Sequence, residues 1–394
     1  LSTIFSFSYN IIAGRMLGPA GYGGFTLVHS IAMFLYIPML LGLNTAMIKY
    51  CADSKDQYQQ SRIISTTYVV VICLTVVSVM LYAILRQQIA AIFSVNQEII
   101  VLSILFAVLF VFYALTTSSL RGLLLMKDYS VFQPIYGITL LSTLLAFIYL
   151  QFYSFKAMVY ATYLAYGVVG SIIVVRFLKQ YLTFAIDRSW LSTLWKYSSV
   201  AVLGGLSFTL YSNIDRIMIN YYMDVESVGV YGVYYYASFT VLTLFSEIFT
   251  IVFFPTASKS HDKSLLYRKL NKIVPYLLIL GIPAALVGEY VILRMFGNGY
   301  TIQLPLMLIF AFTAILVTWY GVYAWFFNSE GIDGAKLTVS GTLIIAIANI
   351  ILNIILIPQI GLYGAIGATA LAFSLGLCYN FYRGMRFFNR KSEN

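Results

Sequence analysis

Apolar stretches of about 20 residues alternate with short polar segments along the chain, and a helix needs about that length to cross roughly 30 Å of hydrocarbon. The pattern therefore predicts an all-α polytopic membrane protein with about twelve transmembrane helices. The predicted spans are residues 1–17, 25–48, 63–85, 99–120, 131–152, 157–175, 197–220, 228–254, 273–296, 304–326, 337–357 and 363–382. The first span is short and the chain opens at Leu1 without a Met, so we expect further residues before it.

The basic residues are distributed unevenly between the two sides of this arrangement. All but five of the 24 Lys and Arg residues lie in alternate connections or after the last predicted span. Basic residues are retained on the cytoplasmic side, which predicts a cytoplasmic-membrane protein with both termini in the cytoplasm. The exceptions are Arg15, Arg86, Lys156, Arg216 and Arg294.

The longest connection, residues 177–196, divides the spans into two groups of six. We therefore expect an N-terminal lobe (1–178), a cytoplasmic linker (179–196) and a C-terminal lobe (197–394). No connection is long enough to hold a soluble domain, so the function must lie within the helix bundle. The loops also lack the large external domain typical of membrane polymerases and glycosyltransferases.

Composition excludes several classes of protein. Hydrophobic residues make up 61% of the chain and charged residues only 10%, against about 25% charged in soluble domains. A cytosolic enzyme, a nucleic-acid binder and a disordered chain are excluded. The three cysteines have no ligand spacing, and the sequence contains no nucleophile motif, metal cluster or Walker loop. We expect a protein that is not an enzyme and holds no cofactor or metal beyond a coupling Na⁺ or H⁺.

Short motifs spread over nearly the whole chain resemble one family. They are residues 14–23 (GRMLGPAGYG), 215–218 (DRIM), 228–231 (VGVY), 296–300 (FGNGY), and 353–358 (NIILIP) with 361–365 (GLYGA). Together they are similar to bacterial polysaccharide (O-antigen type) flippases of the multidrug/oligosaccharidyl-lipid/polysaccharide exporter superfamily. This resemblance implies two six-helix lobes around a central cavity, an alternating-access cycle and polyprenyl-diphosphate-linked sugars as substrates.

The resulting expectation is a flippase that moves a lipid-linked oligosaccharide to the outer leaflet for cell-surface polysaccharide synthesis. Its partners would be this substrate, membrane lipids and polysaccharide polymerase or assembly proteins. A cation-coupled multidrug exporter of the same superfamily is the nearest alternative, although its cavity should be rich in carboxylates. A membrane-embedded glycosyltransferase or ligase is the alternative from another class.

Polar residues follow one face of the seventh predicted span. An ionisable residue inside a membrane usually faces the bundle interior and marks a pathway. We interpret this stripe as part of the cavity, with Arg216 as a counter-charge for a diphosphate and Arg15 in the same role. The alternative is an arginine that extends to the headgroups. The candidate substrate-binding residues are Arg15, Asn213, Arg216 and Asn220.

Asp215 points about 100° away from that stripe, toward a helix of its own lobe. A cation held by Asp215, Asn349 and Asn353, with Thr369 as a fourth ligand, would remove the cost of an unpaired carboxylate there. The alternative is structural, with Asp215 pairing with Arg216 or hydrogen-bonding the two asparagines.

Four further features of the C-terminal half lead to predictions. Glu289 and Arg294, near the outer end of the ninth span, are expected to form an ion pair. Glu247 is interpreted as a hydrogen-bonded acid or a protonatable coupling group. Tyr231 and residues 234–236 are interpreted as an interfacial aromatic belt, with stacking on sugar rings as the alternative. Gly364, in a small-xxx-small spacing, predicts close packing of the last two spans.

Overall fold

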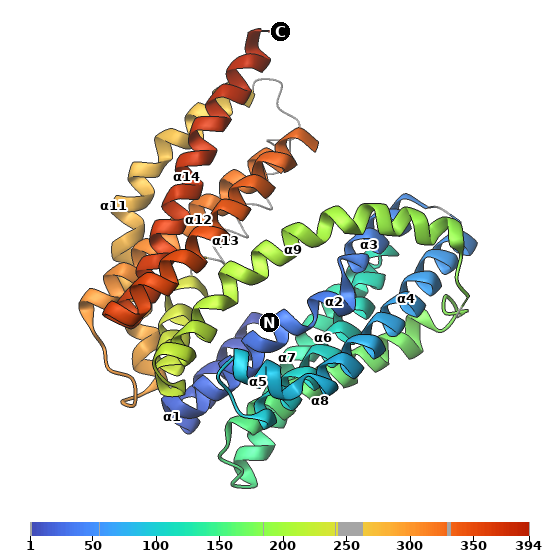
Figure 1. The fold of residues 1–394 in the computed structure, drawn as a ribbon, viewed down its shortest axis with the longest axis horizontal. Coiled ribbons are helices and arrows are strands. Elements are labelled where there is room, and N and C mark those ends of the chain that lie inside the picture. Colours follow the sequence, from blue (N-terminus) through green and yellow to red (C-terminus); the bar gives the residue numbers. More distant parts are fainter. Residues whose placement is uncertain are drawn as a thin grey trace. The chain divides into compact units, whose positions relative to one another are not determined.

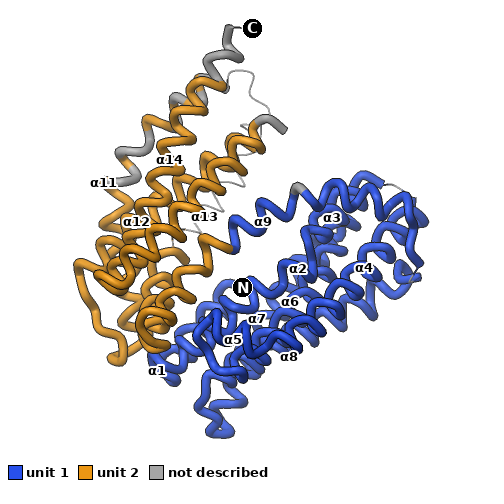
Figure 2. The backbone as a smooth tube through the Cα atoms, in the orientation of Figure 1, with its two compact units in different colours: residues 1–209 blue, residues 210–394 orange. Residues whose placement is uncertain are grey.

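The described residues fold entirely into helices and connecting turns. The computed structural model describes residues 2–54, 56–183, 185–240, 242, 263–328 and 332–393. They form two compact units, residues 1–209 and 210–394 (Figure 2). The boundary between the units lies within α9 (Arg188–Tyr222), C-terminal to the predicted linker 179–196.

The first unit is built from the helices that precede α9 and from the first part of α9 (Figure 1). These helices are α1 (Ser2–Leu35), α2 (Ile37–Leu40), α3 (Leu43–Asp53), α4 (Gln57–Ile84), α5 (Arg86–Ile92), α6 (Gln97–Gly122), α7 (Met126–Tyr149), α8 (Phe155–Ile173) and the π-helical turn η1 (Val174–Leu178). Within α1, Gly18 leaves the helical conformation (φ 66°, ψ −177°) and Pro19 follows it. Glycine adopts this backbone conformation without a steric penalty, so the helix can break at this position. The break lies between the first and the second predicted span.

The second unit contains the rest of α9, a helical segment over residues 225–240 and four long helices. These are α11 (Lys263–Phe296), α12 (Leu304–Asn328), α13 (Ile332–Ile360) and α14 (Leu362–Glu393). α13 and α14 form a hairpin around Gly361, which has a left-handed φ of 59°. A side chain at Gly364 would collide with the Leu356 carbonyl group. The predicted close packing of the last two spans is confirmed.

Nine helices in the described part of the chain are long and apolar enough to cross a membrane. The first of them, Ser2–Leu40, covers nearly all of the predicted span 1–17 and residues 25–40 of the predicted span 25–48. The predicted span 197–220 lies in α9, which is not among the nine, and the predicted span 228–254 extends beyond the described residues. Large apolar side chains on α4, such as Val77 and Met80, are more than 60% exposed, as expected of a helix that faces lipid. The prediction of an all-α polytopic membrane protein is confirmed.

Charged contacts mark the two ends of the first unit. At one end, Arg62 on α4 pairs with Asp187 just before α9 (3.1 Å). At the other end, Lys156 at the start of α8 pairs with Glu98 at the start of α6. Each pair therefore joins residues near the starts of two helices, α4 with α9 in the first case and α6 with α8 in the second.

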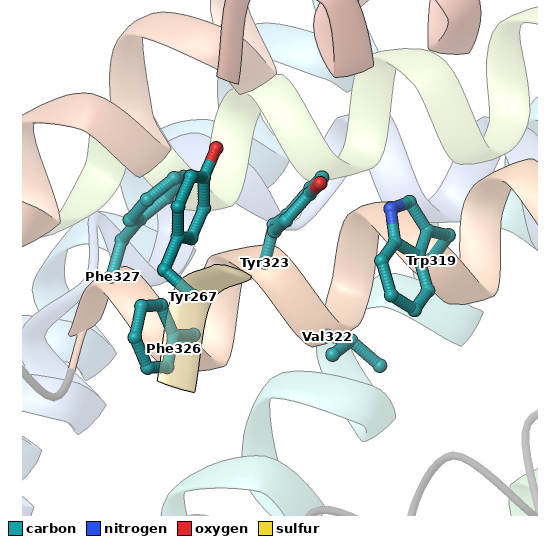
Figure 3. Packing of buried hydrophobic residues seen from close by; sticks show 6 residues of the cluster. All are labelled: Tyr267, Trp319, Val322, Tyr323, Phe326 and Phe327. Carbon is teal, nitrogen blue, oxygen red and sulfur yellow. The ribbon is translucent and has the colours of Figure 1, made fainter. Parts of the chain in front are cut away.

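Aromatic side chains fill part of the core of the second unit (Figure 3). Tyr267 on α11 contacts the rings of α12, and its hydroxyl group donates to the carbonyl oxygen of Asn380 on α14 (3.2 Å). The cluster therefore joins three helices of this unit. Its buried members are Tyr267, Trp319, Val322, Tyr323, Phe326 and Phe327.

Candidate functional site

The carboxylate of Asp215 is the centre of a buried polar cluster inside the second unit. Asp215 is 4% exposed and lies on α9. Its Oδ2 accepts hydrogen bonds from the Tyr231 hydroxyl (2.6 Å) and from Thr369 Oγ1 (2.8 Å). Its Oδ1 accepts a hydrogen bond from Asn353 Nδ2 (2.6 Å). Three helices besides α9 thus contribute a side chain to one carboxylate.

Asn349 completes the cluster from the next turn of α13. Its Nδ2 donates to Thr369 Oγ1 (3.1 Å), and it lies four residues from Asn353, on the same face of the helix. The side-chain oxygens of Asn349 and Asn353 are buried without a hydrogen-bond partner among the described residues. Buried polar atoms are normally hydrogen-bonded, so these two oxygens remain available to a ligand.

The cluster places several oxygen atoms around a single acidic group. Within the described ranges, no three or more His, Cys, Asp or Glu side chains lie close enough together to hold a metal ion. Hard cations prefer carboxylate, amide and hydroxyl oxygens as ligands. The four residues predicted to form an ion site, Asp215, Asn349, Asn353 and Thr369, are thus brought together, while their ion-binding role stays a prediction.

Arg216 contacts other groups than the members of this cluster. Its Nη1 donates to the Ser212 carbonyl oxygen (2.6 Å) and its guanidinium carbon lies 4.5 Å from the centre of the Tyr235 ring. Its Nε is buried without a hydrogen-bond partner in the described structure. Where side chains are described, the ion pairs are Arg62–Asp187 and Lys156–Glu98, so the structure does not pair Asp215 with Arg216.

The other candidate substrate-binding residues occupy different surroundings. Asn213 is buried on α9, and Asn220 is half-buried nearer the end of this helix. Arg15 is exposed on α1 and belongs to residues 1–209, whereas Arg216 belongs to residues 210–394. The structure therefore groups Asn213, Arg216 and Asn220 on one helix, while the role of all four residues stays a prediction.

The predicted ion pair between Glu289 and Arg294 is wrong. Arg294 is exposed, and its Nε donates to the Tyr290 hydroxyl group (3.1 Å). Glu289 is fully buried, and neither carboxyl oxygen has a hydrogen-bond partner within the described part of the chain. Residues five apart lie about 140° apart around a helix, so these two side chains cannot meet.

The tyrosine run was also misjudged from the sequence. Tyr231 and Tyr234 are at most 1% exposed, so they do not form an interfacial belt. Tyr231 donates to Asp215 and is the cluster member that sequence reasoning missed. Its position in the helical segment that follows α9 was a weak signal, because Tyr231 is one of several aromatic residues in that segment. Glu247 lies outside the described residues.

Comparison with solved structures shows which class of protein has this fold. An inward-facing multidrug resistance transporter of the MATE family, in the MOP superfamily, superposes with a TM-score of 0.75 at 13% identity, covering 100% of this chain and 96% of that one. The lipid II flippase MurJ, in an inward closed conformation, gives a TM-score of 0.59 at 15% identity over 97% and 86% of the two chains. The chain therefore has the fold of these multi-pass membrane transporters.

The family follows from the sequence match. The chain belongs to the polysaccharide biosynthesis protein family, which matches residues 12–305. It is 27% identical over 191 residues to the probable low-salt glycan biosynthesis flippase Agl15 of Haloferax volcanii, covering 46% of this chain and 40% of that protein. The chain spans less than half the length of the first curated relatives it matches.

Proposed function

We propose that this protein is a flippase that moves a polyprenyl-diphosphate-linked oligosaccharide across the cytoplasmic membrane by alternating access. Membership of a polysaccharide biosynthesis family carries this proposal, together with the similarity to Agl15. A charged diphosphate and a polar glycan cannot cross hydrocarbon unaided. A polar path through the helices would shelter the head group while the polyprenyl tail stays in lipid. Transport needs no covalent chemistry.

The diphosphate would be held by arginines. Arg216 supports this role because its Nε donor has no partner in the described structure. A guanidinium group matches the geometry of phosphate oxygens with paired donors. Asn213 and Asn220 lie on the same helix and would contribute further hydrogen bonds to the head group. The same head-group role is proposed for Arg15, which lies on α1 of the first unit.

Coupling to a cation would occur at the Asp215 cluster. A single carboxylate among neutral oxygens suits a monovalent cation such as Na⁺, because the ion would then be neutralised. The amide group of Asn353 now donates its N–H to the carboxylate. Rotation of that amide group would present its oxygen to a bound ion instead. Asn349 and Thr369 would supply the remaining oxygens.

A flipping assay in reconstituted vesicles tests this function. A polyprenyl-diphosphate disaccharide would be placed in the inner leaflet, and its arrival outside followed with a membrane-impermeant glycosidase. We expect transfer that depends on the protein and grows with an imposed sodium gradient. Transfer no faster than in protein-free vesicles would reject the proposal. Polymerase or assembly proteins would be the consumers of the flipped lipid in the cell.

Export of organic cations is the second candidate function, because the similarity to a MATE multidrug transporter covers the whole chain. The same vesicles can be loaded with ethidium and given the same sodium gradient. Release of ethidium without transfer of the sugar lipid would establish the exporter instead. Transfer of the sugar lipid alone would establish the flippase.

A further inference from the structure

Glu289 is an acidic residue that the proposed transport mechanism does not use. It lies in the candidate span Ile279–Phe296, about 10 Å from the end of α11 at a rise of 1.5 Å per residue. Its side chain is fully buried, and neither carboxyl oxygen has a hydrogen-bond partner among the described residues. A carboxylate without a donor or counter-ion is unstable in such surroundings.

Among the described residues, the segments packed against α11 offer no positive charge to this carboxyl group. On the segment 225–240, Ser238 lies next to it and Tyr234 is a titratable residue that interacts with it electrostatically. α12 contains no charged residue. On α14, Tyr363 is the titratable residue at this end of the unit. On α11 itself, Arg294 is exposed and faces another direction.

The hydrogen bonds around Ser238 favour the neutral acid. The Ser238 hydroxyl donates its proton to the Tyr234 carbonyl oxygen (2.8 Å). It therefore has no proton left for a carboxylate, but its oxygen can still accept a hydrogen bond. A protonated Glu289 can donate to that oxygen, so protonation gives one of its two carboxyl oxygens a hydrogen-bond partner among the side chains described.

A separate set of hydrogen bonds joins Tyr234, whose carbonyl group Ser238 contacts, to an exposed turn of the same unit. The Tyr234 hydroxyl donates to the Thr301 carbonyl oxygen (2.7 Å) and accepts from the backbone N–H of Gln303 (2.9 Å). Gln303 Oε1 in turn accepts from the exposed Tyr363 hydroxyl (2.9 Å). These groups connect the helix that carries Ser238 to water at the turn before α12.

We propose that Glu289 is a proton-binding site of the second unit, loaded from and emptied to water on the side of the turn 297–303. The proton comes from water and returns to water, so no other reactant is required. When it is bound, Glu289 donates to Ser238. When the proton is released, the Glu289 carboxylate attracts hydrogen-bond donors or water. The site is separate from the Asp215 cluster and does not depend on the identity of the transported molecule.

Infrared difference spectroscopy of the purified full chain in lipid nanodiscs tests this proposal without any substrate. At mildly acidic pH we expect a protonated carboxylic acid carbonyl band that Glu289→Gln removes. On raising the pH this band should convert to carboxylate absorption. Glu98→Gln, which removes an exposed carboxylate paired with Lys156, should leave the band unchanged. Absence of a Glu289-dependent band, or a band that persists until the protein unfolds, would overturn the proposal.

Ser238→Ala provides a second readout. Loss of the acceptor oxygen destabilises only the protonated acid, so the midpoint of the Glu289 titration should move to lower pH. A move to higher pH would mean that Ser238 donates to the carboxylate, which contradicts the arrangement proposed here. Because these spectra need no transported molecule, failure of the flipping assay would leave this result intact, and failure here would leave the flippase proposal intact.

Discussion

Neighbouring residues of α9 face different surroundings, and this difference defines their chemistry. Asp215 is enclosed by hydrogen-bond donors from three other helical segments. Arg216 lies one residue later and packs its guanidinium group on the Tyr235 ring. A buried charge requires such partners, because desolvation is otherwise expensive. At the scale of single residues, two separate roles follow from one helix.

Substitution of Arg216 tests the role in head-group binding. A hydrogen bond to a charged group contributes about 1.5–3 kcal/mol, so Arg216→Ala should weaken binding of the lipid diphosphate about ten- to a hundred-fold. Arg216→Lys should retain part of the affinity, because the charge survives while the paired donors are lost. The flipping rate as a function of substrate concentration measures both. Arg86→Ala on the exposed helix α5 is the control, and equal loss in all three variants would exclude a specific role.

Sodium should stabilise the protein through the Asp215 cluster. A ligand that binds only the folded state raises the melting temperature as its concentration increases. We expect this rise when NaCl replaces KCl at constant ionic strength, and we expect Asp215→Ala and Asn353→Ala to abolish it. Asp224→Asn alters an exposed carboxylate of the same unit and should keep the sodium dependence. A wild-type melting temperature indifferent to sodium would leave Asp215 a structural role only.

At the scale of helices, close packing positions the polar cluster. Asn349 and Asn353 lie on α13 and Thr369 on α14, and the turn at Gly361 sets the register between the two helices. Small residues allow helix backbones to approach closely in membranes. The hairpin therefore decides whether the three side chains can reach the same carboxylate.

Gly364→Ala tests this dependence. The added methyl group would overlap the Leu356 carbonyl group, and overpacking of this kind costs about 1–3 kcal/mol. We expect a lower melting temperature in detergent and a weaker response to sodium. Gly367→Ala is the matched control on the same helix, since nothing lies within 4 Å of a side-chain carbon at that position. Equal melting temperatures for both variants would contradict the packing argument.

The segment before α9 is attached to α4 by contacts that depend on pH. Hydrogen bonds from the Ser189 hydroxyl and from the Trp190 amide, together with Arg62 nearby, hold the pKa of Asp187 below its ordinary value. Its contribution to stability is therefore complete above the ordinary aspartate pKa of about 3.9 and is lost as pH falls through the lower folded value.

Proteolysis of residues 179–187 measures this effect. Cleavage should accelerate as the pH falls through the range in which Asp187 gains a proton. The Asp187→Asn variant should be cleaved faster than the wild type at neutral pH, and its cleavage rate should change less on acidification. An acid-stable protease is required, with cleavage normalised on an unfolded peptide of the same sequence. Identical pH profiles of the cleavage rate for wild type and variant would show that Asp187 does not hold this segment against α4.

At the scale of the whole molecule, the basic residues predict the orientation in the membrane. Residues 53–60, 180–192 and 258–270 should face the cytoplasm, while residues 87–97 and 298–302 should face outside. Single cysteines introduced into a cysteine-free background, in intact cells, test this with a membrane-impermeant reagent. We expect labelling at position 96 and none at position 263. The reverse pattern would invert the topology, and with it the side from which Glu289 exchanges its proton.

The sequence by itself determined the class of protein and most of the helices. Apolar stretches long enough for a bilayer leave few alternatives, because every backbone polar group in lipid must be satisfied within a helix. The residues that surround Asp215 could also be predicted in part. Asn349 and Asn353 recur at helical spacing, and a lone carboxylate in a membrane helix requires oxygen or donor neighbours.

Only the tertiary structure decided which side chains meet. Tyr231 was hidden in an aromatic run, and its contact with Asp215 depends on how the segment 225–240 packs against α9. Glu289 seemed to have a partner in Arg294, but helix geometry turns the two side chains apart. Spacing along one helix predicts which residues share a face. The partner of a buried group lies on another helix, and tertiary packing alone determines the register between helices.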